Sequence, residues 1–142
     1  MHSKSKVYFF FDSVRVSLGE HERVKRMIET IFKKEGKTLE SLNYVFCSDK
    51  RLKEINKQYL NHDYFTDIIT FDLSSSKAIT GEVYISVDRV RENARQLGIP
   101  VRNEFKRVIF HGALHLCGYK DKSKSDVGKM RAREDYYLER GM

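Results

Sequence analysis

The segment VRNEFKRVIFHGALHLC, residues 101–117, is the most apolar helix candidate in this chain of 142 residues. At about 100° per residue, Phe105, Ile109, Gly112 and Leu116 fall on one face of such a helix. This face is too apolar to stay in water, so other elements must cover it. We therefore predict a helix over 101–117 with these four residues at the centre of its buried face.

The segments on either side predict the elements that cover this helix. Apolar runs and two-residue alternation indicate strands, whereas 3–4 spacing and capping residues indicate helices. We predict strands at 7–12, 42–48, 67–73 and 81–87, and further helices at 21–36, 48–60, 88–97 and 124–140. Asp88 is expected to cap the third of these helices. The order β-α-β-α-β-β-α-α-α predicts one α+β domain over residues 1–142, a small mixed sheet packed with helices.

Composition excludes several classes of protein. The chain is 40% hydrophobic and 33% charged, and no apolar run approaches the roughly 20 residues that a membrane span needs. Its basic start is expected to be a mature terminus that enters a strand. Two cysteines, Cys47 and Cys117, are too few for a disulfide framework and are predicted to be reduced core residues. These features favour a cytoplasmic protein with no membrane partner.

Charge is spread unevenly along the chain. The net charge is +7, from 27 Lys and Arg against 20 Asp and Glu. Residues 1–87 hold 14 basic and 12 acidic side chains, and residues 88–142 hold 13 and 8. The basic excess of the second part favours a polyanionic partner such as nucleic acid, although many cytoplasmic proteins are mildly basic.

The segment HGALHLCGYKD, residues 111–121, has the spacing of a metal site. His111 and His115 lie one turn apart on the predicted helix, which suits two imidazoles to one ion. Gly118 allows the backbone to leave the helix in a left-handed conformation, so that Asp121 can turn back toward them. We predict that His111, His115 and Asp121 bind one metal ion and leave an open position for water.

The same spacing also occurs in zinc peptidases of the HExxHxxGxxH/D type. In those enzymes the glutamate after the first histidine is the general base, and here that position is Gly112. Peptide hydrolysis is therefore disfavoured. A phosphodiester substrate fits better, since a metal ion stabilises its developing charge.

Three segments together resemble a known family. HGALHLCGYKD resembles the HGxLHLxGYDH signature of the YbeY-type endoribonuclease and rRNA maturation family. INKQYLNHDYFTDIITF (55–71) is similar to its LNxxYRxxDxxTDVLSF segment, and GEVYIS (81–86) is similar to its GDIxIS strand. The three occur in family order and with family spacing.

The resemblance implies a fold, an activity and a site. It implies an α+β domain with one zinc ion per chain, held by His111, His115 and Asp121 in a cleft beside the sheet. The activity it implies is a single-strand-specific endoribonuclease of the bacterial cytoplasm. Its implied role is 16S rRNA 3′-end maturation on the small ribosomal subunit and ribosome quality control.

The chain departs from the family at two positions. Asp121 stands where the family has histidine, which makes a bound water less acidic and lets another divalent metal, such as manganese, compete with zinc. Leu60 replaces an arginine that would hold phosphate. Arg107, Lys120 and Lys122 are the candidates to supply the missing RNA contact, although a lysine-rich loop is more often only solvated.

Asp67 is the candidate protein base, or a group that orients a ligand, because it enters the strand expected near the motif. A turn or cap role is an equal alternative for Asp67 and its neighbour Thr66. Two other functions are considered. One is a ribosome-assembly factor that binds RNA without cleaving it and uses the metal for stability, and the other is a metallopeptidase with an unusual base.

Overall fold

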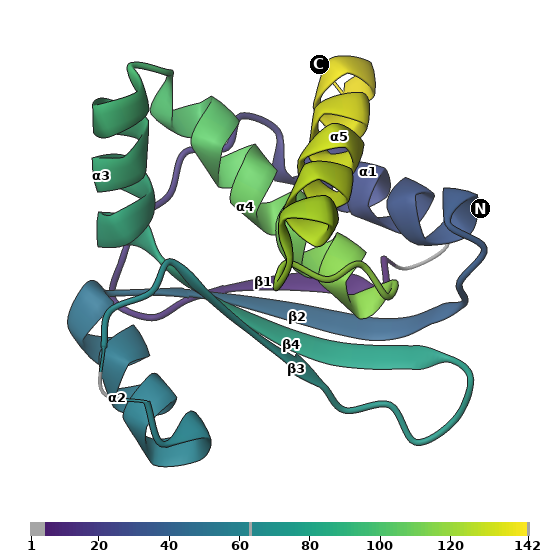
Figure 1. The fold of residues 1–142 in the computed structure, drawn as a ribbon, viewed down its shortest axis with the longest axis horizontal. Helices are drawn as coiled ribbons and strands as arrows, with labels where there is room; N and C mark the ends of the chain where they lie inside the picture. The colour runs from purple at the N-terminus through teal and green to yellow at the C-terminus, as the bar shows by residue number, and fades with distance from the viewer. Residues whose placement is uncertain (1–4, 63, 142) are drawn as a thin grey trace.

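The computed structural model describes residues 5–62 and 64–141 of the chain. Along these residues the elements are β1 (Val7–Phe11), α1 (His21–Lys34), β2 (Leu39–Cys47), α2 (Asp49–Leu60), β3 (Ile68–Asp72), β4 (Ile79–Ser86), α3 (Val87–Leu97), α4 (Val101–Leu116) and α5 (Lys124–Gly141), as Figure 1 shows. The order is the predicted one, and the α+β class is confirmed.

The four strands form one mixed sheet in the order β1-β2-β4-β3. β1 pairs with β2 in parallel, β2 pairs with β4 in parallel, and β3 runs antiparallel to β4. The amide of Ser86 also donates to the carbonyl oxygen of Asp67 at 2.9 Å. Asp67 is thereby fixed at the entrance to β3.

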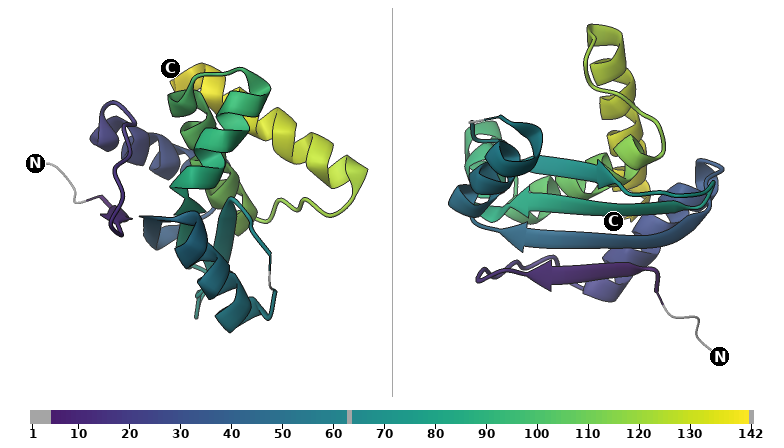
Figure 2. Two further views of the ribbon diagram at one scale, coloured as in Figure 1. Left: turned by 90° about the vertical axis from the view of Figure 1, so that its left-hand side faces the viewer. Right: turned by 90° about the horizontal axis from the view of Figure 1, so that it is seen from below.

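Helices cover both faces of the sheet. α1, α3, α4 and α5 lie on one face, whereas α2 lies on the other (Figures 1 and 2). α4 is at the centre of the first layer, in contact with the three other helices and with β3 and β4. The sequence predicts that other elements cover the apolar face of 101–117, and the structure confirms this.

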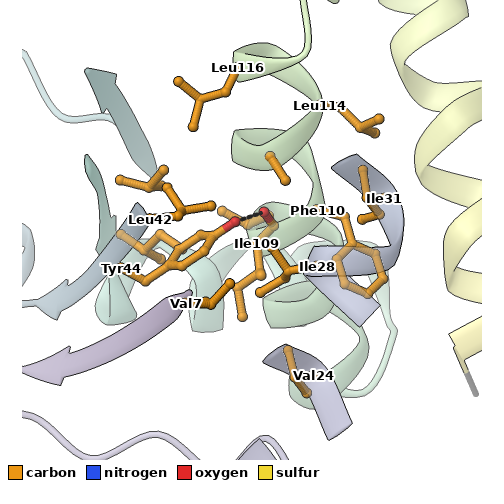
Figure 3. Packing of buried hydrophobic residues seen from close by; sticks show 14 of the residues in the cluster. Val7, Val24, Ile28, Ile31, Leu42, Tyr44, Ile109, Phe110, Leu114 and Leu116 are labelled. Atoms are coloured by element: carbon orange, nitrogen blue, oxygen red, sulfur yellow. Dashed lines mark hydrogen bonds between the residues drawn. The ribbon is translucent and has the colours of Figure 1, made fainter. Parts of the chain in front are cut away.

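The predicted face of α4 is buried against the sheet (Figure 3). Phe105 and Ile109 are completely enclosed, and the Tyr44 hydroxyl of β2 donates a hydrogen bond of 2.7 Å to the Ile109 carbonyl oxygen. At Gly112, an added Cβ atom would lie 3.0 Å from Cγ1 of Val83 and 3.2 Å from Cδ1 of Ile68. Glycine at this position lets α4 approach β3 and β4 closely.

α2 packs on the opposite face over a smaller apolar cluster. Leu52 and Ile55 of α2 are buried there with Cys47 and Ile69 of the sheet. Ser48 caps the helix by accepting a hydrogen bond from the Arg51 amide. This cluster has four buried members, so α2 is held by much less apolar contact than α4.

Side chains at the starts of α2 and α3 also join these two helices. The amide of Asp49 donates to Asp88 at 2.8 Å, while the Ser86 hydroxyl donates to Asp49 at 3.0 Å. The prediction that Asp88 caps α3 is wrong, because Ser86 accepts from the Arg89 amide and is the cap. Asp88 is the second residue of α3, and its carboxylate caps the start of α2 instead.

Cys47 and Cys117 are both buried and free, as predicted. Burial raises the pKa of the Cys117 thiol to about 12, so this group stays protonated. Among the helices within 5–62 and 64–141, none combines the length and apolar character needed to cross a membrane.

Candidate metal centre

The end of α4 has the backbone reversal that the sequence predicted. Cys117 closes the helix, and Gly118 follows with φ of 110°, a conformation that favours glycine. The Gly118 amide donates to the His115 carbonyl, and the Tyr119 amide donates to that of Leu114 at 3.1 Å. The chain beyond Tyr119 is thus directed back along the helix.

Tyr119 anchors this loop to the rest of the protein. Its hydroxyl donates to Glu35 at 2.8 Å, at the end of α1, and accepts from Nε of Arg133 at 3.1 Å. Arg133 also pairs with Glu35 at 3.2 Å, and the Tyr137 hydroxyl donates to the same carboxylate. Glu35 therefore ties the start of the loop to both α1 and α5.

The loop brings Asp121 to His111. Nε2 of His111 lies 3.4 Å from Oδ2 of Asp121. Two ligands of one tetrahedral zinc, each about 2.0 Å from the ion, are separated by about 3.3 Å, so this pair fits a shared metal. His115 is exposed, and nowhere in 5–62 and 64–141 do three His, Cys, Asp or Glu side chains form a cluster able to hold a metal. Two of the three predicted ligands are thus together.

Glu134 of α5 fixes the orientation of the His111 ring. Its Oε2 atom is 2.7 Å from Nδ1 of His111, and the residue is only 4% exposed. A carboxylate only accepts, so Nδ1 carries a proton and Nε2 is the nitrogen available to a metal. Burial lowers the pKa of His111, but the hydrogen bond and charge of Glu134, with Asp121 and Asp67, outweigh it and raise the pKa.

Arg107 holds Glu134 from the other side. Its guanidinium lies 3.2 Å from Glu134, 3.0 Å from Asp135 and 3.7 Å from Glu104. Burial lowers the pKa of Arg107, and its hydrogen bonds to Asp135 and Glu134 raise it by more. The positive charge proposed for RNA is thus already surrounded by three carboxylates, which suits Arg107 to positioning Glu134.

A cavity of about 310 Å³ opens beside these groups. It is lined by Thr66, Asp67, Ile68, Glu104, Arg107, Val108, His111, Asp121, Arg131 and Glu134. The predicted residues Asp67, Arg107, His111 and Asp121 therefore surround one space. Lys120 and Lys122 are exposed on either side of Asp121 in sequence, and neither forms an ion pair or side-chain hydrogen bond with another described residue.

Two further carboxyl groups in this cavity are affected by burial. Burial raises the pKa of Asp67, and the nearby charge of His111 opposes this increase. The amide of Asn93 donates to Oδ2 of Asp67 at 3.3 Å. Glu104 is 5% exposed, its Oε1 atom accepts no hydrogen bond from the described residues, and burial raises its pKa. Asp67 thus faces the cavity with a carboxyl group that accepts a proton more readily than usual.

Sequence reasoning missed Glu134, Arg131 and Glu35. Glu134 and Arg131 belong to the charged helix at the end of the chain. Many residues of this helix are charged, and the sequence does not indicate that Glu134 is the buried one. Their three-residue spacing places both on the same side of α5, but this is visible only once α4 is known to pack there. Glu35 follows the last residue of an amphipathic helix, and nothing in the sequence around it indicates its partners in α5 and the loop after α4.

Comparison with known proteins agrees with the three sequence segments. A model of the family described as "Endoribonuclease YbeY" matches residues 12–141. The chain belongs to the endoribonuclease YbeY family. Its match includes all of the segments 55–71, 81–86 and 111–121, so the resemblance seen in the sequence is confirmed.

Individual relatives match most of the chain. A protein of Cytophaga hutchinsonii named endoribonuclease YbeY is 45% identical over 133 residues, which are 93% of each chain. Another of that name, from Flavobacterium psychrophilum, is 50% identical over 78% of this chain and 79% of its own. The solution structure of TM1509 from Thermotoga maritima matches with a TM-score of 0.65 at 29% identity, over 95% of this chain and 88% of that one.

Proposed function

We propose that this protein is a metal-dependent endoribonuclease that cleaves single-stranded RNA, with zinc as its metal. We further propose that it matures the 3′ end of 16S rRNA on the small ribosomal subunit, in the cytoplasm, and acts in ribosome quality control. The observation that carries the activity is the His111 ring, held by Glu134 at Nδ1 with Nε2 beside Asp121. Relatives that share up to half of the sequence are named endoribonucleases.

His111, Asp121 and His115 would hold the ion, and rotation of the exposed His115 side chain would complete the set. When bound, the metal supplies a Lewis acid for the scissile phosphodiester and its developing charge. A set with one carboxylate also accepts manganese or another divalent ion. The pairing of Nδ1 with Glu134 holds the ring so that Nε2 would be the nitrogen that binds the ion.

The other residues around the cavity act on the proton and on phosphate. The Asp67 carboxylate is placed to accept a proton from the attacking water, since burial has raised its pKa toward the working pH. Arg131 lines the same cavity and forms no ion pair with any other described residue, so it replaces the missing arginine at Leu60 better than Arg107 does. Lys120 and Lys122 would neutralise the neighbouring backbone phosphates.

The preference for single strands is supported by an exposed aromatic pair that directly precedes two residues of the cavity lining. Tyr64 and Phe65 are 53% and 49% exposed, immediately before Thr66 and Asp67. The buried Asn56 donates to the carbonyl oxygen of Tyr64 at 3.1 Å and fixes the backbone there. Unpaired bases can stack on such rings, whereas bases inside a duplex cannot.

The structure also gives a reason against peptide hydrolysis. Gly112 occupies the position of the peptidase glutamate, and it lies against Val83 and Ile68 of the sheet. A side chain at this position would point into the core and not into the cavity. The family match and this packing both favour RNA over peptide substrates.

The decisive experiment is cleavage of a labelled single-stranded RNA by the purified protein and by His111→Ala prepared in parallel. His21→Gln, a histidine change on α1 away from the cavity, is the matched control. We expect the wild type and the control to cut and His111→Ala to be inactive. Equal cutting by all three would mean a contaminating nuclease, and a metal-loaded wild type that binds RNA without cutting would favour the assembly-factor function.

A further inference from the structure

A second and larger cavity, of about 420 Å³, lies away from the candidate metal centre. It is formed where the start of α1, the first half of α4 and the end of α5 meet. Nine residues separate Arg102 in this cavity from His111, which places them on opposite sides of α4 and about 13 Å apart along its axis. The two cavities have no residue in common.

The floor of the second cavity is apolar. Phe110 of α4 and Leu138 of α5 are buried at its base, and Met27 of α1 adds a partly buried side chain. The volume lies within the range of cavities that hold small ligands, about 300–1,000 Å³. A flat ring laid on this floor would remove apolar surface from water on both sides of the contact.

The rim of the same cavity is cationic. Arg23, Arg102 and Lys106 line it against a single carboxylate, Glu20, and burial and then the charges of Arg102 and Arg23 lower the pKa of Lys106. Arg23 and Arg102 form no ion pair with any side chain in 5–62 and 64–141. This differs from Arg107, whose charge three carboxylates surround. Like charges gathered around one hollow favour an anion there.

We propose that this cavity is a nucleotide-binding site, in which Arg23, Arg102 and Lys106 bind the phosphate and the base lies on the apolar floor. The Asn103 side chain, also in the lining, offers a donor and an acceptor to the edge of the base. An inorganic anion would leave the floor unused, and an acidic peptide would lack the flat ring that fits it. The nucleotide belongs either to an RNA strand or to the free pool. Since the cavity contains none of the candidate metal ligands, the proposal stands apart from the cleavage activity.

The test is calorimetric titration of the full-length protein with adenosine 5′-monophosphate, adenosine and inorganic phosphate. We expect the monophosphate to bind at least tenfold more tightly than either part alone. The variant Arg23→Gln/Arg102→Gln should weaken that binding at least tenfold. The control Lys50→Gln/Lys77→Gln removes the same charge from exposed positions outside the cavity and should change binding less than twofold.

Additional arms identify the source of the nucleotide and guard against misfolding. A single-stranded RNA hexamer, titrated with EDTA present, should displace the monophosphate if RNA is the source and should leave it bound if the free pool is. Lys106→Gln replaces the double variant if thermal melting shows that the latter does not fold. His111→Ala should bind the monophosphate normally, which separates this site from the cleavage activity.

Several results would overturn the proposal. It fails if the monophosphate does not bind at millimolar concentration, or binds the double variant and the wild type equally. Equal affinity for inorganic phosphate and the monophosphate would mean an anion site without a base. Binding of an acidic peptide but not of the monophosphate would assign the cavity to a protein partner.

Discussion

The two sides of α4 differ in what they bury. The side toward the sheet buries Phe105 and Ile109 in an apolar core, whereas the side toward α5 buries Glu104 fully and Arg107 and His111 in part. The apolar side gains stability from every contact, but each charge on the other side loses its hydration and requires a partner. One helix thus carries both the fold and the site, and α5 supplies most of the partners.

The difference implies separate consequences for mutations on the two sides. Changes toward the sheet should lower stability most, and changes toward α5 should act mainly on metal binding. Four variants test this expectation in order of decreasing effect.

Phe105→Ala should have the largest effect on stability. The ring is completely buried, and removing such a side chain costs about 3–5 kcal/mol of the free energy of unfolding. Urea unfolding followed by circular dichroism measures the loss. Leu97→Ala, at a position 59% exposed, is the control and should cost less than about 1 kcal/mol. Equal losses for the two variants would mean that the core does not depend on this face.

Glu134→Gln should lower metal affinity more than stability. The amide keeps the size of the side chain but cannot hold the His111 and Arg107 charges as a carboxylate does. Loss of a group that orients a ligand typically costs 10–100-fold in affinity, and we expect about 1–3 kcal/mol in stability. Competition with a zinc-sensitive dye measures the first quantity. Glu139→Gln, exposed on the same helix, is the control and should leave metal affinity and stability unchanged. An unaltered metal affinity in Glu134→Gln would show that Glu134 does not position His111.

Glu35→Gln should have a smaller effect of the same kind. Its carboxylate receives the Tyr119 and Tyr137 hydroxyls and pairs with Arg133, so its loss loosens the loop that carries Asp121. We expect about 1–2 kcal/mol in stability, because the amide oxygen still accepts one hydrogen bond. Thermal melting with and without zinc measures this loss of stability. Glu22→Gln, on the exposed side of α1, is the control. If zinc stabilises Glu35→Gln as much as the wild type, the loop does not depend on this anchor.

Asp67→Asn should raise stability slightly in metal-free protein. The folded pKa of Asp67 lies above its ordinary value, so the ionised form opposes folding. This penalty is absent below the ordinary pKa, grows as the pH rises through it, and is complete above the folded pKa. The melting temperature of the variant should therefore exceed that of the wild type at pH 7 and equal it near pH 3. A variant that melts earlier at pH 7 would show that the carboxylate stabilises the fold.

Local patterns in the sequence were sufficient for much of the fold. The order of the elements, the buried face of α4 and the turn at Gly118 follow from periodicity and backbone preference, which act over a few residues. These same rules placed His111 and Asp121 near one another, because one helix and one turn connect them.

Contacts between distant segments were beyond those rules. Glu134 lies 23 residues from His111, and Tyr119 lies 84 residues from Glu35. Such partners depend on how α5 and α1 pack, and no short-range preference encodes this. For the same reason, no pattern in the sequence indicated that two carboxylates of α5 lie beside Arg107, whose contact with RNA stays a prediction.

The weak attachment of α2 has a consequence for motion. A helix held by a small apolar cluster should open locally. The amide hydrogens of α2 should therefore exchange with solvent well before those of α4, whose exchange should require unfolding of the main core. The chain leaving α2 carries Tyr64 and Phe65, and the helix itself provides Asn56 to hold them. The aromatic segment that precedes Thr66 and Asp67 should therefore move more readily than the candidate metal ligands, which α4 and α5 position.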